Sequence, residues 1–185
     1  GLSGHSSQPE LGDNAIMKLV RSLDLLESEL GMNLADFTHP VLGHATINVG
    51  MIRGGTRANI IPDQASAQID IRFPPSLTTK GSTREFLEVF IAERGLPLTL
   101  ERCVENPPME VPVDNEWLTR LTALNPQSRL VGAPWFSDAA HLNDRGIPAV
   151  CLGPGSIAQA HTKDEFISIA DLERGANYFT KLVAN

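Results

Sequence analysis

Two stretches of the sequence alternate apolar and polar residues, and this alternation limits the possible folds more than any other feature. In residues 46–51 and again in 65–73, every second residue is apolar. A period of two is typical of a β-strand with one buried face, and it places Ile47, Val49 and Met51 together on that face. The segment between the stretches is too long for a two-residue turn, so we expect a hairpin with a longer loop.

A helix is predicted before this hairpin. From Ile16 to Leu30, apolar residues recur at spacings of three and four, which is the pattern of a helix with one buried face. Asp13 or Asn14 can cap the beginning of this helix, and Gly31 is its expected end.

A second helix is predicted after the hairpin. Ser82 and Glu85 have the spacing of a capping box, and Gly95 is the expected end of the helix that they open. Residues 96–104 then have the pattern of another strand. With a short strand at the N-terminus, the order is strand, helix, strand, strand, helix, strand. This is the ferredoxin-like βαββαβ arrangement of a small α+β domain.

The pattern changes at a cluster of prolines near Pro108, which we interpret as a domain boundary between residues 1–107 and 108–185. Residues 147–152 of the second part are apolar without alternation. Such a run indicates a strand covered on both faces, as in an α/β domain. Helices are predicted over residues 114–124, over 137–143 and from Ser168 onward.

The charge balance narrows the possible partners. The chain has 15 basic and 22 acidic residues and no basic run, which argues against nucleic acid as a partner. No apolar run approaches the ~20 residues that span a bilayer, and the N-terminal residues lack the features of a signal peptide. Cys103 and Cys151 lie in predicted strands, so we expect buried, reduced thiols of a cytoplasmic protein.

Among the histidines, His161 has the most informative setting. It follows the predicted strand over 147–152 through Gly153-Pro154-Gly155, and open α/β sheets gather catalytic groups at the carboxyl ends of strands. One histidine does not make a zinc site, which needs three or four protein ligands. A solvated loop histidine is the alternative interpretation.

Arg72 lies on the polar face of the strand predicted over 65–73, together with Gln68 and Asp70. Such a face is usually only solvated. A guanidinium is, however, also the best bidentate partner for a substrate carboxylate.

Five segments, taken in order, share one resemblance: GLSGHSSQPELGDNAI, INVGMIRGGTRANIIPDQASAQIDIRF, WFSDAAHL, GIPAVCLGPG and AHTKDEF. Together they are similar to the dinuclear-zinc amidohydrolase and metallopeptidase family. Its members include acetylornithine deacetylase, succinyl-diaminopimelate desuccinylase, aminoacylase and carboxypeptidase G. The resemblance extends over essentially the whole chain. Within the family, GPGSIAQAHTKDEF is most similar to the acetylornithine deacetylases.

The resemblance implies a function for each half of the chain. Residues 1–107 would form the lid, or dimerisation domain, of such an enzyme. Residues 108–185 would form the carboxyl-terminal part of its α/β catalytic domain. The lid is expected to pair with a second lid through its first helix and the edge strand beside it, which makes the enzyme a homodimer.

The resemblance also implies roles for individual residues. His161 corresponds to the last zinc-ligating histidine of the family. His5 corresponds to the lid histidine that reaches the partner subunit's active site and stabilises the oxyanion there. The other matching positions bind the substrate or shape its pocket: Asn59, Arg72, Gly153 and Gly155.

The rest of the family's catalytic part, with its other metal ligands and its general-base glutamate, has no match in this sequence. We therefore expect a fragment whose metal site is incomplete. In the whole cytoplasmic enzyme, the resemblance implies two zinc ions, or cobalt, that activate water for hydrolysis of an N-acyl amino acid. N-acetylornithine, an intermediate of amino-acid biosynthesis, is the first candidate substrate.

Two alternatives stay open. The chain could serve only as a dimerisation module that is inactive by itself. The parent enzyme could also be a dipeptidase, a carboxypeptidase or a desuccinylase of the same family.

Overall fold

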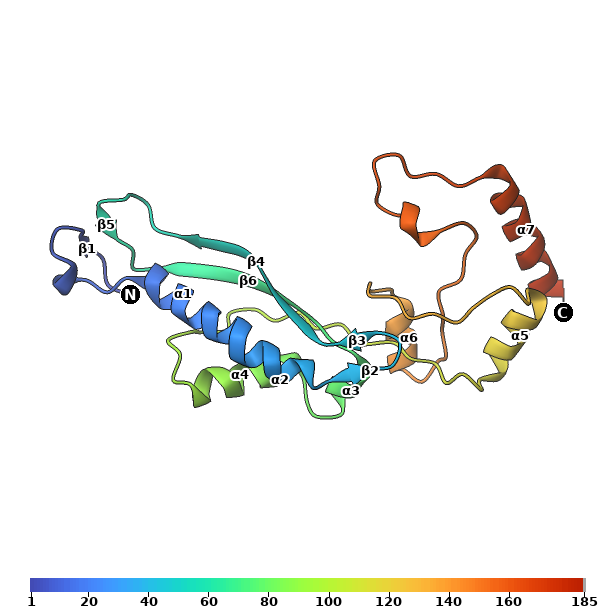
Figure 1. Cartoon of the computed structure of the whole chain (residues 1–185), viewed down its shortest axis with the longest axis horizontal. Coiled ribbons are helices and arrows are strands. Elements are labelled where there is room, and N and C mark those ends of the chain that lie inside the picture. Colours follow the sequence, from blue (N-terminus) through green and yellow to red (C-terminus); the bar gives the residue numbers. More distant parts are fainter. Residues whose placement is uncertain (185) are drawn as a thin grey trace. The chain divides into compact units, whose positions relative to one another are not determined.

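The computed structural model describes residues 1–184, and the chain divides into two compact units, Gly1–Pro108 and a second unit that begins at Met109. Figure 1 labels the elements of both units. The elements of the first unit are β1 (Gly4–His5), η1 (Pro9–Leu11), α1 (Ala15–Leu25), η2 (Leu26–Leu30), α2 (Gly31–Ala35), β2 (Thr38–His39), β3 (Gly43–His44), β4 (Thr46–Gly54), β5 (Ile60–Ile61), β6 (Ala65–Arg72), α3 (Pro75–Thr78) and α4 (Thr83–Glu93). Those of the second unit are α5 (Glu116–Leu124), α6 (Ala139–Asp144), η3 (Ile157–Gln159) and α7 (Ile169–Ala184).

The first helix begins where the sequence predicts and continues further. The Oδ1 atom of Asn14 accepts a hydrogen bond from the Met17 amide at 3.0 Å, which confirms Asn14 as the cap. The prediction that Gly31 ends the helix is wrong. Gly31 has helical angles, and the chain passes through the π-helical turn η2 into α2. Leu34, one turn beyond Gly31, is fully buried, so packing of this last turn outweighs the weak helix propensity of glycine.

The two alternating stretches form the predicted hairpin, with β4 and β6 antiparallel. Ile47 lies opposite Ile71 and Val49 opposite Ile69. A bulge between Val49 and Met51 then shifts the register, so Met51 lies opposite Gln68 and is exposed. The prediction that Met51 shares the buried face is wrong, because one extra residue in a strand reverses the alternation beyond it.

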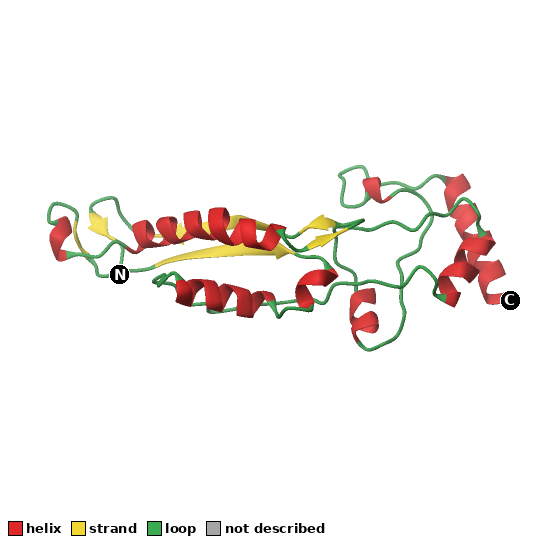
Figure 2. Ribbon diagram, turned by 60° about the horizontal axis from the view of Figure 1, so that its bottom comes forward, coloured by secondary structure: helices red, strands yellow, loops and turns green. Residues whose placement is uncertain are grey.

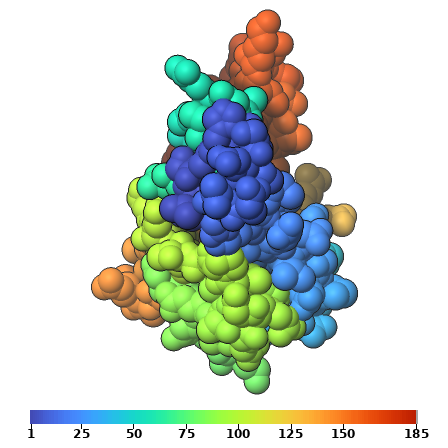
Figure 3. Space-filling model, turned by 90° about the vertical axis from the view of Figure 1, so that its left-hand side faces the viewer, coloured from blue at the N-terminus to red at the C-terminus, as the bar shows by residue number. Residues whose placement is uncertain are grey.

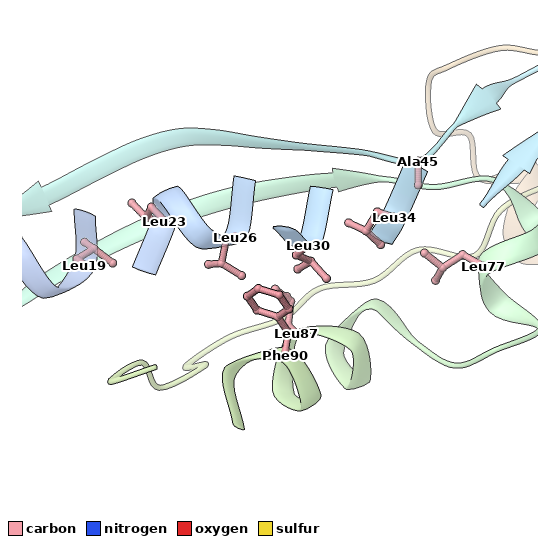
Figure 4. Close-up of a cluster of buried hydrophobic side chains, with 9 residues drawn as sticks. All are labelled: Leu19, Leu23, Leu26, Leu30, Leu34, Ala45, Leu77, Leu87 and Phe90. Carbon is pink, nitrogen blue, oxygen red and sulfur yellow. The ribbon is translucent and has the colours of Figure 1, made fainter. Parts of the chain in front are cut away.

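The core of the first unit lies between the helices and one face of the β4–β6 ribbon. Figure 2 shows α1 and α4 running along this ribbon. In Figure 4, Leu26 and Leu30 lie next to Leu87 and Phe90 of α4, and the same buried cluster contains Leu19, Leu23 and Leu34. Apolar side chains of the strands pack against this cluster: Ile47, Val49, Ala65, Ala67, Ile69 and Ile71.

The second helix of this unit has the predicted ends. Ser82 and Glu85 form both hydrogen bonds of the capping box at the start of α4, and Gly95 follows the helix with a φ of +58°. Residues 96–104 are not part of any strand in the structure, which corrects the prediction. Their alternating leucines still pack on the core, so burial alone accounts for the pattern: Leu96, Leu98 and Leu100.

The fold class is therefore confirmed only in its central part. The order helix, strand, strand, helix is present in α1, β4, β6 and α4. The N-terminal strand β1 pairs with β5 in a separate two-stranded sheet rather than with the ribbon. The ferredoxin-like description is not confirmed, because neither outer strand joins the β4–β6 pair within the described residues.

The regular elements of the second unit, within the described residues, are all helices. Asn115 caps α5, and Ser168 accepts a hydrogen bond from the Asp171 amide at 3.0 Å at the start of α7. These two helices are joined by the Tyr178 hydroxyl, which donates to the Leu121 carbonyl at 2.8 Å.

The strand predicted over 147–152 is not formed in the described chain, where this segment is extended but has no strand partner. Ile147 is 54% exposed and Leu152 43% exposed, so the prediction of a strand covered on both faces is wrong here. Cys151 is also exposed rather than buried, and both cysteines are free thiols. A strand of this kind is stable only beside neighbouring strands.

Within residues 1–184, none of the helices combines the length and the apolar character that a membrane span requires.

Candidate functional site

His5 lies in β1, at one end of the first unit. The two-residue strand pairs with β5, so that Gly4 lies opposite Ile61 and His5 opposite Ile60. The His5 side chain is exposed. Its Nδ1 atom is 2.7 Å from the Ser7 hydroxyl and accepts a hydrogen bond from the Ser7 amide at 3.2 Å. Both contacts are at Nδ1, so another molecule can contact the ring at its Nε2 edge.

The β1–β5 pairing brings Asn59 to the same place. The Ser6 amide donates to the Asn59 carbonyl at 3.1 Å, which joins the residues directly after His5 to the residue directly before β5. Figure 3 views this end of the unit and shows the N-terminal segment in dark blue beside the teal segment that contains β5. Two of the predicted site residues, His5 and Asn59, therefore lie close together on exposed backbone.

Arg72 lies at the other end of the same unit. It is the last residue of β6 and lies opposite Thr46, whereas the first residue, Ala65, lies opposite Gly54. The path from Ala65 to Arg72 along β6 covers about 23 Å at the rise of a β-strand, and β1 and β5 lie beyond the Ala65 end (Figure 1). The structure thus separates Arg72 from His5 and Asn59.

The Arg72 side chain has an acidic neighbour. Its Nε atom is 2.7 Å from the Asp70 carboxylate, and the two side chains are 60% and 54% exposed. This confirms that both residues share the polar face of the strand. An exposed pair of this kind is weak, so an incoming carboxylate can compete with Asp70 for the guanidinium.

His161 lies in a turn of the second unit, just after η3. Its φ of +61° is in the left-handed region, where residues other than glycine are uncommon. The His161 amide donates to the Glu165 carboxylate at 3.0 Å, which holds the turn. Gly155, in the loop before η3, has a φ of +86° that glycine adopts without strain. Gly153 precedes it in the same loop and has open space around it.

The described residues do not form a complete metal site. No group of three or more His, Cys, Asp or Glu side chains in residues 1–184 is arranged to hold a metal ion. His161 alone is too few ligands for zinc, which needs at least three. Residues 1–184 therefore do not fit a self-contained zinc site.

Sequence reasoning overlooked two residues that hold these histidines. Ser7 contacts His5, and Glu165 contacts the His161 amide. Their short distance in the sequence could have indicated these contacts, because Ser7 follows His5 by two residues and Glu165 follows His161 by four.

Comparison with known proteins gives the family. Residues 1–93 match the family described as "Peptidase dimerisation domain". Acetylornithine deacetylase from Proteus mirabilis is 32% identical over 192 residues, a match that covers 100% of this chain and 49% of that protein. A probable carboxypeptidase from Ajellomyces capsulatus is 25% identical, with 99% of this chain and 42% of that protein covered. The chain thus spans about half the length of the curated relatives that it matches.

Solved structures show the same fold. A tripeptidase from Staphylococcus aureus superposes with a TM-score of 0.68 at 22% identity, covering 96% of this chain and 47% of that chain. A metallo-carboxypeptidase of the M20 family from Sulfolobus solfataricus gives 0.67 at 16% identity, covering 96% and 54%. Together with the family match over residues 1–93, these likenesses show that the chain belongs to the M20 peptidase family and contains its dimerisation domain.

Proposed function

We propose that this chain is the dimerisation domain and a carboxyl-terminal catalytic segment of a cytoplasmic, metal-dependent hydrolase that cleaves the amide bond of an N-acyl amino acid. N-acetylornithine is the proposed substrate. The acetylornithine deacetylase relative supports this choice, because its match extends over the whole of this chain.

The observation that carries the proposal is the pairing of β1 with β5, which presents His5 and Asn59 together at one exposed end of the dimerisation domain. In a hydrolase of amides, the carbonyl oxygen gains negative charge as water attacks. A hydrogen-bond donor placed at that oxygen stabilises the transition state. We assign this role to His5 and substrate binding to Asn59.

We propose that Arg72 and His5 of one subunit contact two different substrate molecules. The two residues lie at opposite ends of the first unit, with the length of β6, about 23 Å, between Arg72 and the end that contains His5, which is further than a small N-acyl amino acid extends. In a homodimer, His5 and Asn59 of one subunit would serve the partner's active site. Arg72 would bind a substrate carboxylate in the active site of its own subunit.

The second unit contributes His161 and the loop that contains Gly153 and Gly155. We propose that His161 is one ligand of a metal site and that the two glycines allow the loop to approach the substrate. The other ligands would come from residues outside this chain, because the described residues offer no group of three. By itself, this chain would then be inactive.

A second candidate function is peptide hydrolysis by the same site. The probable carboxypeptidase relative favours it, since its match covers 99% of this chain. The two functions differ in the group on the acyl side of the cleaved bond. The ratio of kcat/KM for N-acetylornithine and for dipeptides separates them.

The test is His5→Ala in a longer enzyme that contains this chain. We expect turnover to fall about 100-fold, the usual effect of removing one oxyanion donor, with no change in bound metal. His44→Ala is the matched control, because His44 is also exposed in a two-residue strand but lies away from β1. Normal turnover of His5→Ala would refute the role of His5.

A further inference from the structure

We propose that Ser7 is a positioning residue that fixes the neutral imidazole of His5 as the tautomer with its proton on Nε2. The proposal deepens the role of His5 argued above and depends on it for its catalytic meaning. It concerns a hydrogen-bonded unit made of His5 and Ser7, which we call the His5–Ser7 turn.

The hydrogen bond from the Ser7 amide indicates which ring nitrogen carries the proton. A backbone N–H can only donate, and the Ser7 amide donates to Nδ1 of His5 at 3.2 Å. Nδ1 must then present a lone pair. In a neutral imidazole, only one nitrogen carries hydrogen, so the proton is on Nε2.

The Ser7 hydroxyl strengthens this assignment. Its oxygen lies 2.7 Å from Nδ1, an ordinary length for a hydrogen bond from a hydroxyl. Because Nδ1 accepts, the hydroxyl donates. Two donors on one residue thus point at the same lone pair, and both would oppose a proton on Nδ1.

The backbone around the pair is held on both sides, so the ring has a fixed base. The ladder between β1 and β5 holds His5 itself. The Ser6 amide donates to the Asn59 carbonyl at 3.1 Å, and the Gln8 amide donates to the His5 carbonyl at 3.0 Å. This frame fixes the position of Ser7 relative to the ring.

The Nε2–H tautomer is the form that His5 needs for its proposed role. An Nε2–H group directed away from the turn donates to an oxyanion without the ring becoming charged. The other tautomer would present a lone pair there, and a lone pair repels an oxyanion. Ser7 would therefore act on the reaction only through His5.

The first experiment measures the tautomer directly, with this 185-residue chain labelled with ¹⁵N. Long-range ¹H–¹⁵N correlation spectra distinguish a protonated from an unprotonated ring nitrogen, and His5→Asn identifies the His5 signals by their loss. In the neutral ring we expect an unprotonated Nδ1 and a protonated Nε2. A protonated Nδ1 in the neutral ring would overturn the proposal.

Ser7 variants test which group holds the tautomer. In Ser7→Ala, the two nitrogen shifts of His5 should move toward each other, as the ring begins to exchange between tautomers. Ser7→Thr keeps a hydroxyl and should restore the original shifts. Ser6→Ala is the matched control, because Ser6 contacts Asn59 through its backbone amide and should leave His5 unchanged. Unchanged shifts in Ser7→Ala would refute a positioning role of the hydroxyl.

Kinetics of the longer enzyme then test the catalytic consequence. Loss of one hydrogen bond that orients a donor should lower kcat about 3- to 10-fold with little change in KM, and Ser7→Thr should recover most of it. A shifted tautomer with unchanged kcat would break the link between Ser7 and turnover. If the tautomer is as proposed but His5→Ala retains full turnover, the proposed role of His5 fails while the structural assignment stands.

Discussion

Single carboxylates hold backbone amides at several points in this chain. Glu85 accepts from the Ser82 amide at 2.9 Å and Glu105 from the Thr83 amide at 3.0 Å, both at the beginning of α4. Glu165 accepts from the His161 amide at 3.0 Å. The first amides of a helix have no partner within the helix, and a negative charge there also complements the helix dipole. At His161, a carboxylate likewise holds a backbone amide, here in a turn where the φ of His161 is in the left-handed region.

Asp171, in the first turn of α7, gives a prediction about pH. The Ser168 hydroxyl donates to its carboxylate, and Arg174 forms an ion pair with it, so the pKa of Asp171 is lowered from its ordinary value. A carboxyl whose pKa is lower in the folded state stabilises the fold above its unfolded pKa, and this stabilisation is lost as the pH falls through the folded pKa.

The comparison is between the original chain and Asp171→Asn, with helix unfolding followed by far-ultraviolet circular dichroism. At about pH 6 the original chain should unfold at the higher temperature, and the difference should shrink toward about pH 2. Ser168→Ala removes the largest cause of the lowered pKa and should reduce the pH dependence. A difference independent of pH would contradict this account.

At the scale of elements, Glu105 joins the extended segment after α4 to the beginning of that helix. Its carboxylate accepts from both the amide and the hydroxyl of Thr83, at 3.0 and 2.6 Å, and Thr83 is only 5% exposed. The contact spans 22 residues of sequence. It therefore anchors the last part of the first unit, although no strand forms there.

Glu105→Ala should destabilise the first unit, because it leaves two polar groups of a buried residue without their partner. We expect a loss of about 1–3 kcal/mol in the free energy of unfolding, measured with urea. Glu101→Ala is the control, since Glu101 is exposed in the same segment. Equal stability of the two variants would show that water replaces the carboxylate at Thr83.

Predictions from the sequence succeeded where the cause is local. The Asn14 cap and the capping box at Ser82 each join residues three positions apart, and the alternation that predicts each hairpin strand lies within that strand. The strands predicted over 96–104 and 147–152 failed because a strand depends on partners elsewhere, which periodicity does not show. The closeness of His5 and Asn59 is likewise non-local. Their roles came from a family resemblance, and only the β1–β5 pairing places them together.

At the scale of the whole molecule, the dimerisation domain exposes the apolar side chains of Met17 and Val20 on α1 and of Met51 and Ile52 on β4. The ribbon has only two strands within the described residues, so β4 has an edge without a strand partner. Such an edge can extend a sheet across two subunits. We propose the surface of α1 together with this edge of β4 as the contact between two lids.

The prediction is that the chain is a dimer at micromolar concentration and that Val20→Glu or Met51→Lys makes it a monomer, because each would bury a charge in the contact. Size-exclusion chromatography with light scattering measures the mass. Val89→Glu is the matched control, because Val89 is 55% exposed on α4, which is not part of the proposed contact, and should leave the dimer intact. A monomeric original chain, or a dimer that survives both substitutions, would exclude this surface. If His5 acts in the partner's active site, the two subunits would then have to meet through a different contact, because a single dimerisation domain offers His5 no partner site.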